Sequence, residues 1–310
     1  MAQKKRQKRK KTDKKPIHYL YVSLLLIVVL FCWSGVWSLF ENKSGDILPS
    51  VEGLLKDRKK DTGSADGNAK NDEVLEQEKT GLELPAALVG KPEIILAREA
   101  YTSSYNIETL CPNYVAWHLT ADRIEGNAVR KNVFRGDDDI PEKYRIETSD
   151  YARSGYDRGH MCPAGDCKSS DEMMSESFLM TNICPQGHNL NAGDWKELEE
   201  LCREWASSYG EIFIVCGPIF DSERPKTIGK RKGHKASVPD RFFKVVLMMG
   251  RVPKAIGFIY PNEDTNLDVR DYAVSVDEVE RITGIDFYPS LPDDIESEIE
   301  SECKPGVWGI

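Results

Sequence analysis

Two long stretches near the N-terminus are defined by what they lack. From Ile17 to Phe40 the sequence has no residue with a fixed charge. That run exceeds the apolar part of a cleavable signal peptide, about 7 to 15 residues, and favours a transmembrane helix, which needs about 20. Residues 41–90 contain no Phe, Trp or Tyr. A charged stretch with so little apolar area cannot offset its ordering entropy, so we expect a flexible tether there.

The first 16 residues form a basic tail. They carry nine Lys or Arg against Asp13 alone. Because cytoplasmic flanks of membrane helices are rich in Lys and Arg, we expect residues 1–16 in the cytoplasm and the domain outside it. Two alternatives stay open: a secretion signal that is processed, and a basic arm that binds nucleic acid.

The rest of the chain lacks positive charge. The formal net charge is -9, and removing the tail's +8 leaves -17 after Pro16. Most of this body repels phosphate at long range, so any binding of nucleic acid must be local. Seven of the eight cysteines follow the uncharged run. Disulfides are permitted outside the cytoplasm, but an odd number leaves at least one cysteine unpaired or paired between chains.

Residues 91–310 show no internal repeat and read as one globular domain. Short β-rich runs bounded by turn signals predict strands: EIILA, NYVAWHLT, EIFIVCGPIF, FFKVVLMM and AIGFIYP. Periodic apolar positions predict helices: DEMMSESFLMTN, DWKELEELCREWASSYG and SVDEVERITG. This mixture indicates the α+β class, with a central antiparallel sheet flanked by helices.

Two segments of this domain carry residues suited to chemistry. In YDRGHMCPAGD, a histidine follows Asp157, Arg158 and Gly159 directly. This places a titrating imidazole beside a fixed cation and a carboxylate that could orient it. Some twenty residues later, four amide side chains precede the amphipathic helix: Asn182, Gln186, Asn189 and Asn191. A helix cap needs one Asn at most, and a core would not tolerate four amides without partners.

At these residues the sequence resembles the DNA/RNA non-specific endonuclease family of the ββα-metal (His-Me finger) superfamily. The resemblance runs from about Cys111 to Pro289. It rests on ordered motifs: DRGH at 157–160, N-x-x-x-Q at 182–186, N-x-x-x-W-x-x-x-E at 191–199, CGPIF at 216–220 and VPDRFFKV at 238–245. The resemblance implies a ββα-metal nuclease fold, cleavage of DNA and RNA without sequence preference, and a homodimer as one oligomeric state found in the family.

The resemblance also implies roles for individual residues. His160 would act as general base, and Asn191 would be the protein side chain that holds a hydrated Mg²⁺, or Mn²⁺ in its place. Glu199 would hold a water of that ion. If both residues shared a helix, eight positions would separate their backbones by about 12 Å, too far for comfortable direct coordination by both. A single amide ligand suits Mg²⁺ because that ion keeps several of its waters.

The remaining candidates support the phosphate. The resemblance also implies an arginine ahead of an aromatic residue that stabilises transition-state charge. Arg130, ahead of Phe134, is the best match, although Arg123, Lys131 and Arg135 are nearby alternatives. Arg158 and Asn182 complete the predicted catalytic set, and Asp157 and Gln186 are predicted to bind substrate.

The basic segment RPKTIGKRKGHK, residues 224–235, is the last candidate. It has six Lys or Arg, among them Lys230, Arg231 and Lys232, which we predict to attract the phosphate backbone without reading bases. A solvated loop remains the alternative.

Two other function classes compete with an enzyme. One is a membrane-anchored module that captures nucleic acid without cutting it. The other is a structural domain stabilised by zinc or disulfides through Cys162, Cys167, Cys184 and His188, although no second matching ligand pair follows. These cysteines could equally fill space, and Cys216 within an apolar run is expected to be a small buried hydrophobe.

Overall fold

The computed structural model describes residues 81–263 and 267–310. The predicted cytoplasmic tail, membrane helix and most of the tether fall outside these ranges, so those three predictions remain untested. Within the described ranges, no helix is long and apolar enough to cross a bilayer.

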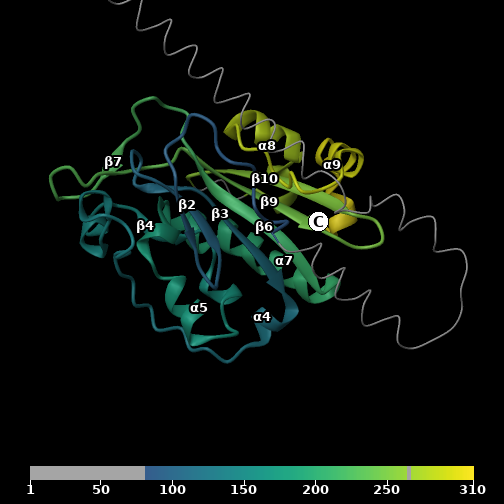
Figure 1. Ribbon diagram of the computed structural model, residues 1–310, viewed down its shortest axis with the longest axis horizontal. Helices are drawn as coiled ribbons and strands as arrows, with labels where there is room; N and C mark the ends of the chain where they lie inside the picture. Colours follow the sequence, from purple (N-terminus) through teal and green to yellow (C-terminus); the bar gives the residue numbers. More distant parts are fainter. Residues whose placement is uncertain (1–80, 264–266) are drawn as a thin grey trace, which may run out of the picture. The chain divides into compact units, whose positions relative to one another are not determined.

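A seven-stranded antiparallel sheet forms the centre of the domain (Figure 1). Its order is β1-β2-β3-β6-β9-β10-β11, and every neighbouring pair is antiparallel. The strand bounds are β1 Ile94–Ala97, β2 Thr102–Asn106, β3 Cys111–Thr120, β6 Glu211–Ile219, β9 Arg241–Met248, β10 Lys254–Pro261 and β11 Ala273–Val274. The five runs predicted as strands are therefore confirmed as β1, β3, β6, β9 and β10.

Both faces of the sheet are buried, which explains why its strands read as unbroken apolar runs. Along β6, Ile212 and Ile214 belong to one core cluster, while Phe213 and Val215 belong to the other. The first cluster lies under α7 and the second under α8 and α9. These helices lie on the two sides of the sheet in Figure 1. Alternate side chains of one strand therefore fill two separate cores.

The predicted helices are present. DWKELEELCREWASSYG folds as α7, Asp194–Tyr209, and SVDEVERITG as α8, Val276–Thr283. DEMMSESFLMTN splits into α5, Asp171–Glu176, and a 3-10 turn, Met180–Asn182. The other helices are α4 Ala121–Glu125, α6 His188–Ala192 and α9 Asp293–Glu300, with further 3-10 turns at Glu142–Tyr144, Thr148–Tyr151, Ala164–Asp166, Val269–Tyr272 and Pro305–Trp308.

The start of the domain corrects one predicted boundary. Leu82 is buried in the core under α8 and α9, and the backbone N–H of Ala86 donates to Asp286 O at 2.9 Å. Leu82, Pro85 and Leu88, expected at the end of the tether, therefore pack on the folded body, whereas Val89 is exposed. The apolar run LELPAALV contributes buried area that a count of aromatic residues does not reveal.

Candidate active site

A small hairpin and a short helix hold the predicted chemical residues. The strands β4, Asp157–His160, and β5, Ile183–Gln186, pair antiparallel, with Asp157 opposite Gln186 and His160 opposite Ile183. The chain then turns through Gly187 into α6, which carries Asn191. This β-β-α unit packs on the first core cluster through buried side chains such as Leu190 and Ile183.

One cleft brings most of the predicted residues together. It has a volume of about 710 Å³, and six of the predicted residues line it: Arg130, Asp157, Arg158, His160, Asn191 and Glu199. His160 and Asn191 come from different elements but face the same space. The two side chains therefore line one continuous cleft.

The imidazole of His160 is buried among aromatic rings. It is 8% exposed, and its ring centroid lies 5.3 Å from Phe134 and 5.2 Å from Phe178. Burial, together with the positive charges of Arg130 and Arg158, lowers the pKa of His160 to about 3. Its Nε2 has no hydrogen-bond partner among the described residues. The ring is therefore held as a neutral base at physiological pH.

Asp157 fixes the orientation of the Asn191 amide. Asn191 Nδ2 donates to Asp157 Oδ2 at 3.0 Å, and His188 Nδ1 lies 2.8 Å from the same oxygen. Because the amide nitrogen is engaged, Oδ1 of Asn191 is the atom left to bind a cation. Asp157 thus positions the predicted ligand.

Glu199 reaches the cleft from α7, a different helix from the one that carries Asn191. The two helices meet at Gly193, whose φ of -113° and ψ of -107° interrupt the helical path. The expected spacing along one continuous helix therefore does not apply. Burial raises the pKa of Glu199 to about 7, although the buried cation of Lys244 opposes this shift. Glu199 is consequently the carboxyl group of the cleft that titrates near neutral pH.

Two cations that sequence reasoning missed line the same cleft from α7. They are Lys196 and Arg203, three positions before and four positions after Glu199, which is the spacing of one helical face. That spacing could have identified both residues from the sequence. Arg203 Nη1 lies 3.0 Å from Asp166 Oδ1, and Asp166 is almost fully buried, so Arg203 is held in place. Lys196 is exposed, with only a 3.5 Å pair to Glu200.

The structure separates Arg130 from the neighbouring cations considered for the same role. Arg130 lines the cleft, with its guanidinium carbon 5.4 Å from the Phe178 ring centroid. Arg123 instead donates to three backbone carbonyls, and Arg135 donates to Ser175 O at 2.8 Å. Lys131 faces a different pocket. Arg158 stacks on Phe134 at 4.2 Å and also lines the cleft.

Two predicted amides, Asn182 and Gln186, do not line the cleft. Asn182 is fully buried. Its Oδ1 accepts from Cys162 N at 2.9 Å, and its Nδ2 donates to Cys162 O and Ser177 O. Asn182 therefore positions the loop that follows His160. Gln186 is also fully buried, and its side chain lies so close to Gly159 that a Cβ there would come within 2.1 Å of Oε1.

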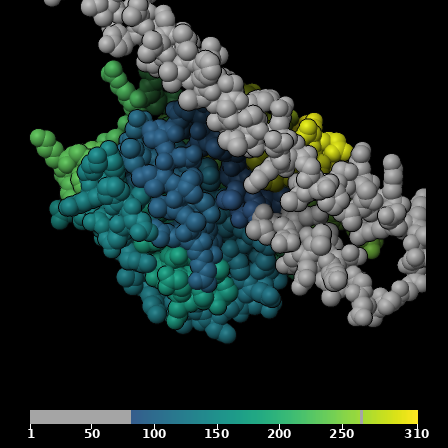
Figure 2. Space-filling model, viewed as in Figure 1, coloured from purple at the N-terminus to yellow at the C-terminus, as the bar shows by residue number. Residues whose placement is uncertain are grey.

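The basic segment, residues 224–235, lies outside the lining of the cleft apart from its contact with Tyr156. It contains the strand β7, Thr227–Ile228, which pairs with β8, Ala236–Ser237, directly after the segment. Its green side chains stand out from the surface in Figure 2. Arg231 is paired with the buried carboxylate of Asp150 and donates to Arg145 O at 2.8 Å. It is thus a structural residue. Lys230 and Lys232 are exposed but do not line the cleft.

Lys226 is the residue that connects the basic segment to the cleft. Its Nζ donates to Tyr156 Oη at 3.0 Å and lies 4.8 Å from the Tyr156 ring centroid. Tyr156 lines the cleft. The basic segment therefore adjoins the rim, even though Lys230 and Lys232 do not enter it.

The cysteines argue against a structural zinc site. All seven cysteines in the described ranges are free, and six of them are buried. Cys162 and Cys167 lie with their sulfur atoms 3.7 Å apart, but His188 is exposed and bound to Asp157. The groupings of ligand-type side chains found in the described residues do not include these cysteines. Cys216 is fully buried, as predicted.

The donor set of the cleft fits a hard cation that keeps most of its waters. The oriented amide oxygen of Asn191 and the carboxylate of Glu199 are both oxygen donors, the kind that Mg²⁺ prefers. No thiol lines the cleft among the described residues, which disfavours a soft metal. The residues present therefore fit Mg²⁺ or Mn²⁺ held mainly by water and phosphate.

Comparison with known proteins gives consistent matches over the folded region. A family model described as DNA/RNA non-specific endonuclease matches residues 85–294. A protein named mitochondrial nuclease EXOG from Danio rerio is 36% identical over 218 residues, covering 65% of this chain and 64% of its own. A nuclease from a Nostoc species is 36% identical, covering 67% and 78%. The mitochondrial nuclease of Saccharomyces cerevisiae is also 36% identical, covering 67% and 68%.

A solved structure shares the fold. It is the crystal structure of an EndoG/EndoGI complex, described as showing the mechanism of EndoG inhibition. The TM-score is 0.61 and the identity 26%, with 66% of this chain and 89% of that chain covered. The central antiparallel sheet and its flanking helices are therefore those of an EndoG-like nuclease.

Proposed function

Because the chain belongs to the DNA/RNA non-specific endonuclease family, we propose that it is a divalent-metal-dependent endonuclease that hydrolyses DNA and RNA without sequence preference. The observation that carries this proposal is the shared cleft of His160, Asn191 and Glu199. These three side chains come from three separate elements, and folding brings them to one space large enough for a phosphodiester.

His160 supplies the base in the proposed mechanism. Its low pKa keeps the imidazole neutral, so it can accept a proton from the attacking water as that water bonds to phosphorus. A buried base is a weak proton acceptor when free. The negative charge of a phosphate bound beside His160 would raise the pKa of its imidazole in the substrate complex.

Cations around the cleft stabilise the charge that develops on phosphate. Arg130 and Arg158 lie close enough to His160 to lower its pKa, and Lys196 and Arg203 approach from α7. Such preplaced charges stabilise a transition state more strongly than the ground state. When bound, the metal ion supplies Lewis-acid stabilisation of the phosphate and the leaving oxygen. Asn191 would hold that ion, and Glu199 would hold one of its waters.

Cleavage without sequence preference follows from the charges that line the cleft. Arginine and lysine side chains contact phosphates, which carry no sequence information. The proposed cleavage of both DNA and RNA therefore depends on recognition of the phosphate backbone.

The direct test is cleavage of circular double-stranded DNA, circular single-stranded DNA and RNA with Mg²⁺, Mn²⁺ or chelator. We expect cleavage of all three with metal and none with chelator. We expect His160→Ala to lower the rate by about 10² to 10⁴, the usual contribution of a positioned base. His118→Gln is the matched control, since His118 pairs with Glu211 outside the cleft. Full activity of His160→Ala would refute the assignment of the base.

The alternative is a nucleic-acid capture module on the same fold. It predicts that the protein binds DNA in the presence of Mg²⁺ and leaves the DNA intact. Retention of His160, Asn191 and Glu199 in one cleft favours the enzyme, because capture alone needs no base. A cleavage assay run beside a filter-binding assay separates the two.

We further propose that the enzyme is anchored in a membrane through residues 17–40, with residues 1–16 cytoplasmic and the nuclease domain outside the cytoplasm. The basic tail followed by an uncharged apolar stretch supports this arrangement. The intervening tether, beginning at residue 41, would let the domain reach substrates near the membrane surface.

A further inference from the structure

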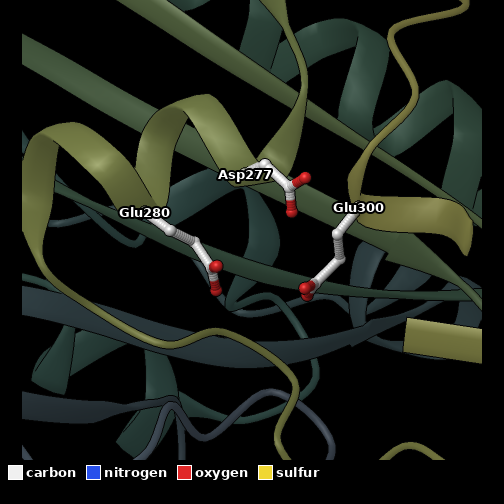
Figure 3. Close-up of side chains that lie close together, drawn as sticks. All are labelled: Asp277, Glu280 and Glu300. Carbon is white, nitrogen blue, oxygen red and sulfur yellow. The ribbon is translucent and has the colours of Figure 1, made fainter. Parts of the chain in front are cut away.

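A second oxygen-rich site lies on the side of the sheet away from the cleft. Asp277 and Glu280 project from α8, and Glu300 is the last residue of α9. Figure 3 shows the three carboxylates pointing toward one another across the space between the two helices. One oxygen from each lies within 4.8 Å of the others. None of these residues belongs to the cleft or to the proposed reaction.

The geometry matches the reach of one calcium ion. Calcium binds oxygen at about 2.3 to 2.6 Å, so two ligands of the same ion are at most about 5 Å apart. Asp277 and Glu280 are three positions apart and so share one face of α8. Glu300 approaches from the other helix. The exposed side at Asp277 leaves room for the waters that complete a calcium shell.

The buried member of the group lacks a partner. Glu300 is 4% exposed, and its Oε1 has no hydrogen-bond partner among the described residues. A buried, unpartnered carboxylate oxygen is costly unless something compensates it. None of the ion pairs found in the described ranges involves Asp277, Glu280 or Glu300. The group that would satisfy this oxygen is therefore not a lysine or arginine of the described chain.

The electrostatic surroundings add to the need for a cation. Burial raises the pKa of Glu300 to about 9, and four further carboxylates add to this: Glu280, Glu296, Asp277 and Asp286. Glu300 also lies at the C-terminal end of α9, where the helix dipole is negative. A divalent ion would offset the repulsion among these carboxylates.

We propose that Asp277, Glu280 and Glu300 form a calcium site that joins α8 to α9. One oxygen of Glu280 already accepts from Phe287 N at 2.7 Å, which leaves the other for the ion. The site is structural: it fastens α9, which packs through Ile299 on the second core cluster. It does not depend on the proposed nuclease function.

Thermal unfolding with calcium alone tests this site. We use the full-length protein carrying Asn191→Ala, which removes the cation ligand of the cleft, and compare about 10 mM Ca²⁺ with chelator. A structural calcium site of extracellular type has a Kd of about 10⁻⁴ to 10⁻³ M. The expected rise in Tm is therefore about 3 to 10 °C. Calorimetric titration should give one ion per chain.

Matched variants decide the location of the bound ion. Glu300→Gln should abolish the calcium-dependent rise, and Asp277→Asn, an exposed change that cannot disrupt the core, should reduce it. Glu298→Gln is the control, because Glu298 is exposed on the same helix outside the group. In an otherwise unmodified chain, Glu300→Gln should keep Mg²⁺-dependent cleavage. The proposal is overturned if Ca²⁺ gives no rise, or if the rise survives in Glu300→Gln. If the unmodified chain shows no cleavage but calcium still raises Tm, only the nuclease proposal is contradicted.

Discussion

The two titrating groups of the cleft have pKa values shifted in opposite directions. Burial lowers the pKa of His160 to about 3 and raises that of Glu199 to about 7. Burial disfavours the charged form in both cases, which for histidine is the acid and for glutamate the base. Between pH 6 and 8 the imidazole therefore stays neutral, and Glu199 is the group that changes charge.

This difference predicts a pH dependence that belongs to Glu199. Protonated Glu199 cannot accept a hydrogen bond from a metal-bound water at full strength, so at limiting Mg²⁺ we expect activity to rise from pH 6 to 8. Raising Mg²⁺ should move the rise to lower pH, because the cation competes with the proton. Initial rates over a grid of pH and Mg²⁺ measure this. Glu199→Gln should lower activity and remove the rise; a rise that persists unchanged in that variant would assign it to another group.

The bond from Asn191 to Asp157 predicts a positioning effect. Asp157→Ala frees the Asn191 amide to rotate, and loss of such an outer partner typically costs about 10 to 100-fold in metal affinity. We expect the Mg²⁺ concentration for half-maximal rate to rise by that factor, with much of the rate recovered at high Mg²⁺. His188→Ala removes the other contact of Asp157 and should change the Mg²⁺ requirement far less. If high Mg²⁺ recovers nothing, Asp157 acts on substrate and not through Asn191.

The sequence allowed prediction of His160, Asn191 and Glu199 but could not separate exposed from buried amides. Asn182 and Gln186 have the same chemistry as Asn191 and lie in the same short segment, yet both are fully buried. Their positions depend on the β4-β5 pairing, a long-range contact that local patterns do not encode. Lys196 and Arg203 could have been predicted from the sequence, because their spacing from Glu199 places them on the same face of a helix.

At the scale of elements, the burial pattern of each strand decided whether the strand could be predicted from the sequence. The inner strands have apolar residues on both faces, so β6 and β9 stood out as runs. β2 did not, because its sequence TSSYN is polar. Its serines are buried, and Ser103 Oγ donates to Thr181 O at 3.0 Å. The predicted helix began at Asp194, where α7 starts, but the short helix α6 escaped prediction because its polar sequence is also compatible with a loop.

The basic segment predicts different outcomes for adjacent residues. Lys230→Ala and Lys232→Ala together should reduce the salt dependence of DNA binding, by about 0.9 in slope for each lost phosphate contact. Arg231→Ala should instead destabilise the fold by about 1 to 3 kcal/mol, because it leaves the carboxylate of Asp150 buried without its main cation. Binding titrations at several salt concentrations and urea unfolding measure the two effects.

Two results would contradict these different roles for Arg231 and the two lysines. If Arg231→Ala changed the salt slope with no loss of stability, the pair with Asp150 would not form in solution. If the double lysine variant left the slope unchanged, the solvated-loop interpretation of residues 230–232 would hold.

At the scale of the whole molecule, the sheet separates the cleft from the proposed calcium site. The cleft and its titrating groups lie on the side of the first core cluster, and the proposed calcium group lies on the side of the second. Charge is divided as well: the tail is strongly basic, while the remaining chain has a net charge of -17. Such a molecule relies on the local cations of the cleft and its rim to hold nucleic acid.

The proposed topology can be tested with a cysteine that the fold exposes. Cys303 is exposed, whereas the six other cysteines in the described ranges are buried. We expect a membrane-impermeant maleimide to label the full-length protein in intact bacterial spheroplasts after mild reduction, because the domain is proposed to lie outside the cytoplasm. Cys303→Ser should lose the label, and a cytoplasmic protein with an exposed cysteine serves as the leak control. Labelling that requires lysis would place the domain inside the cell. Labelled protein that appears in the supernatant rather than with the membranes would instead indicate that residues 17–40 act as a processed secretion signal.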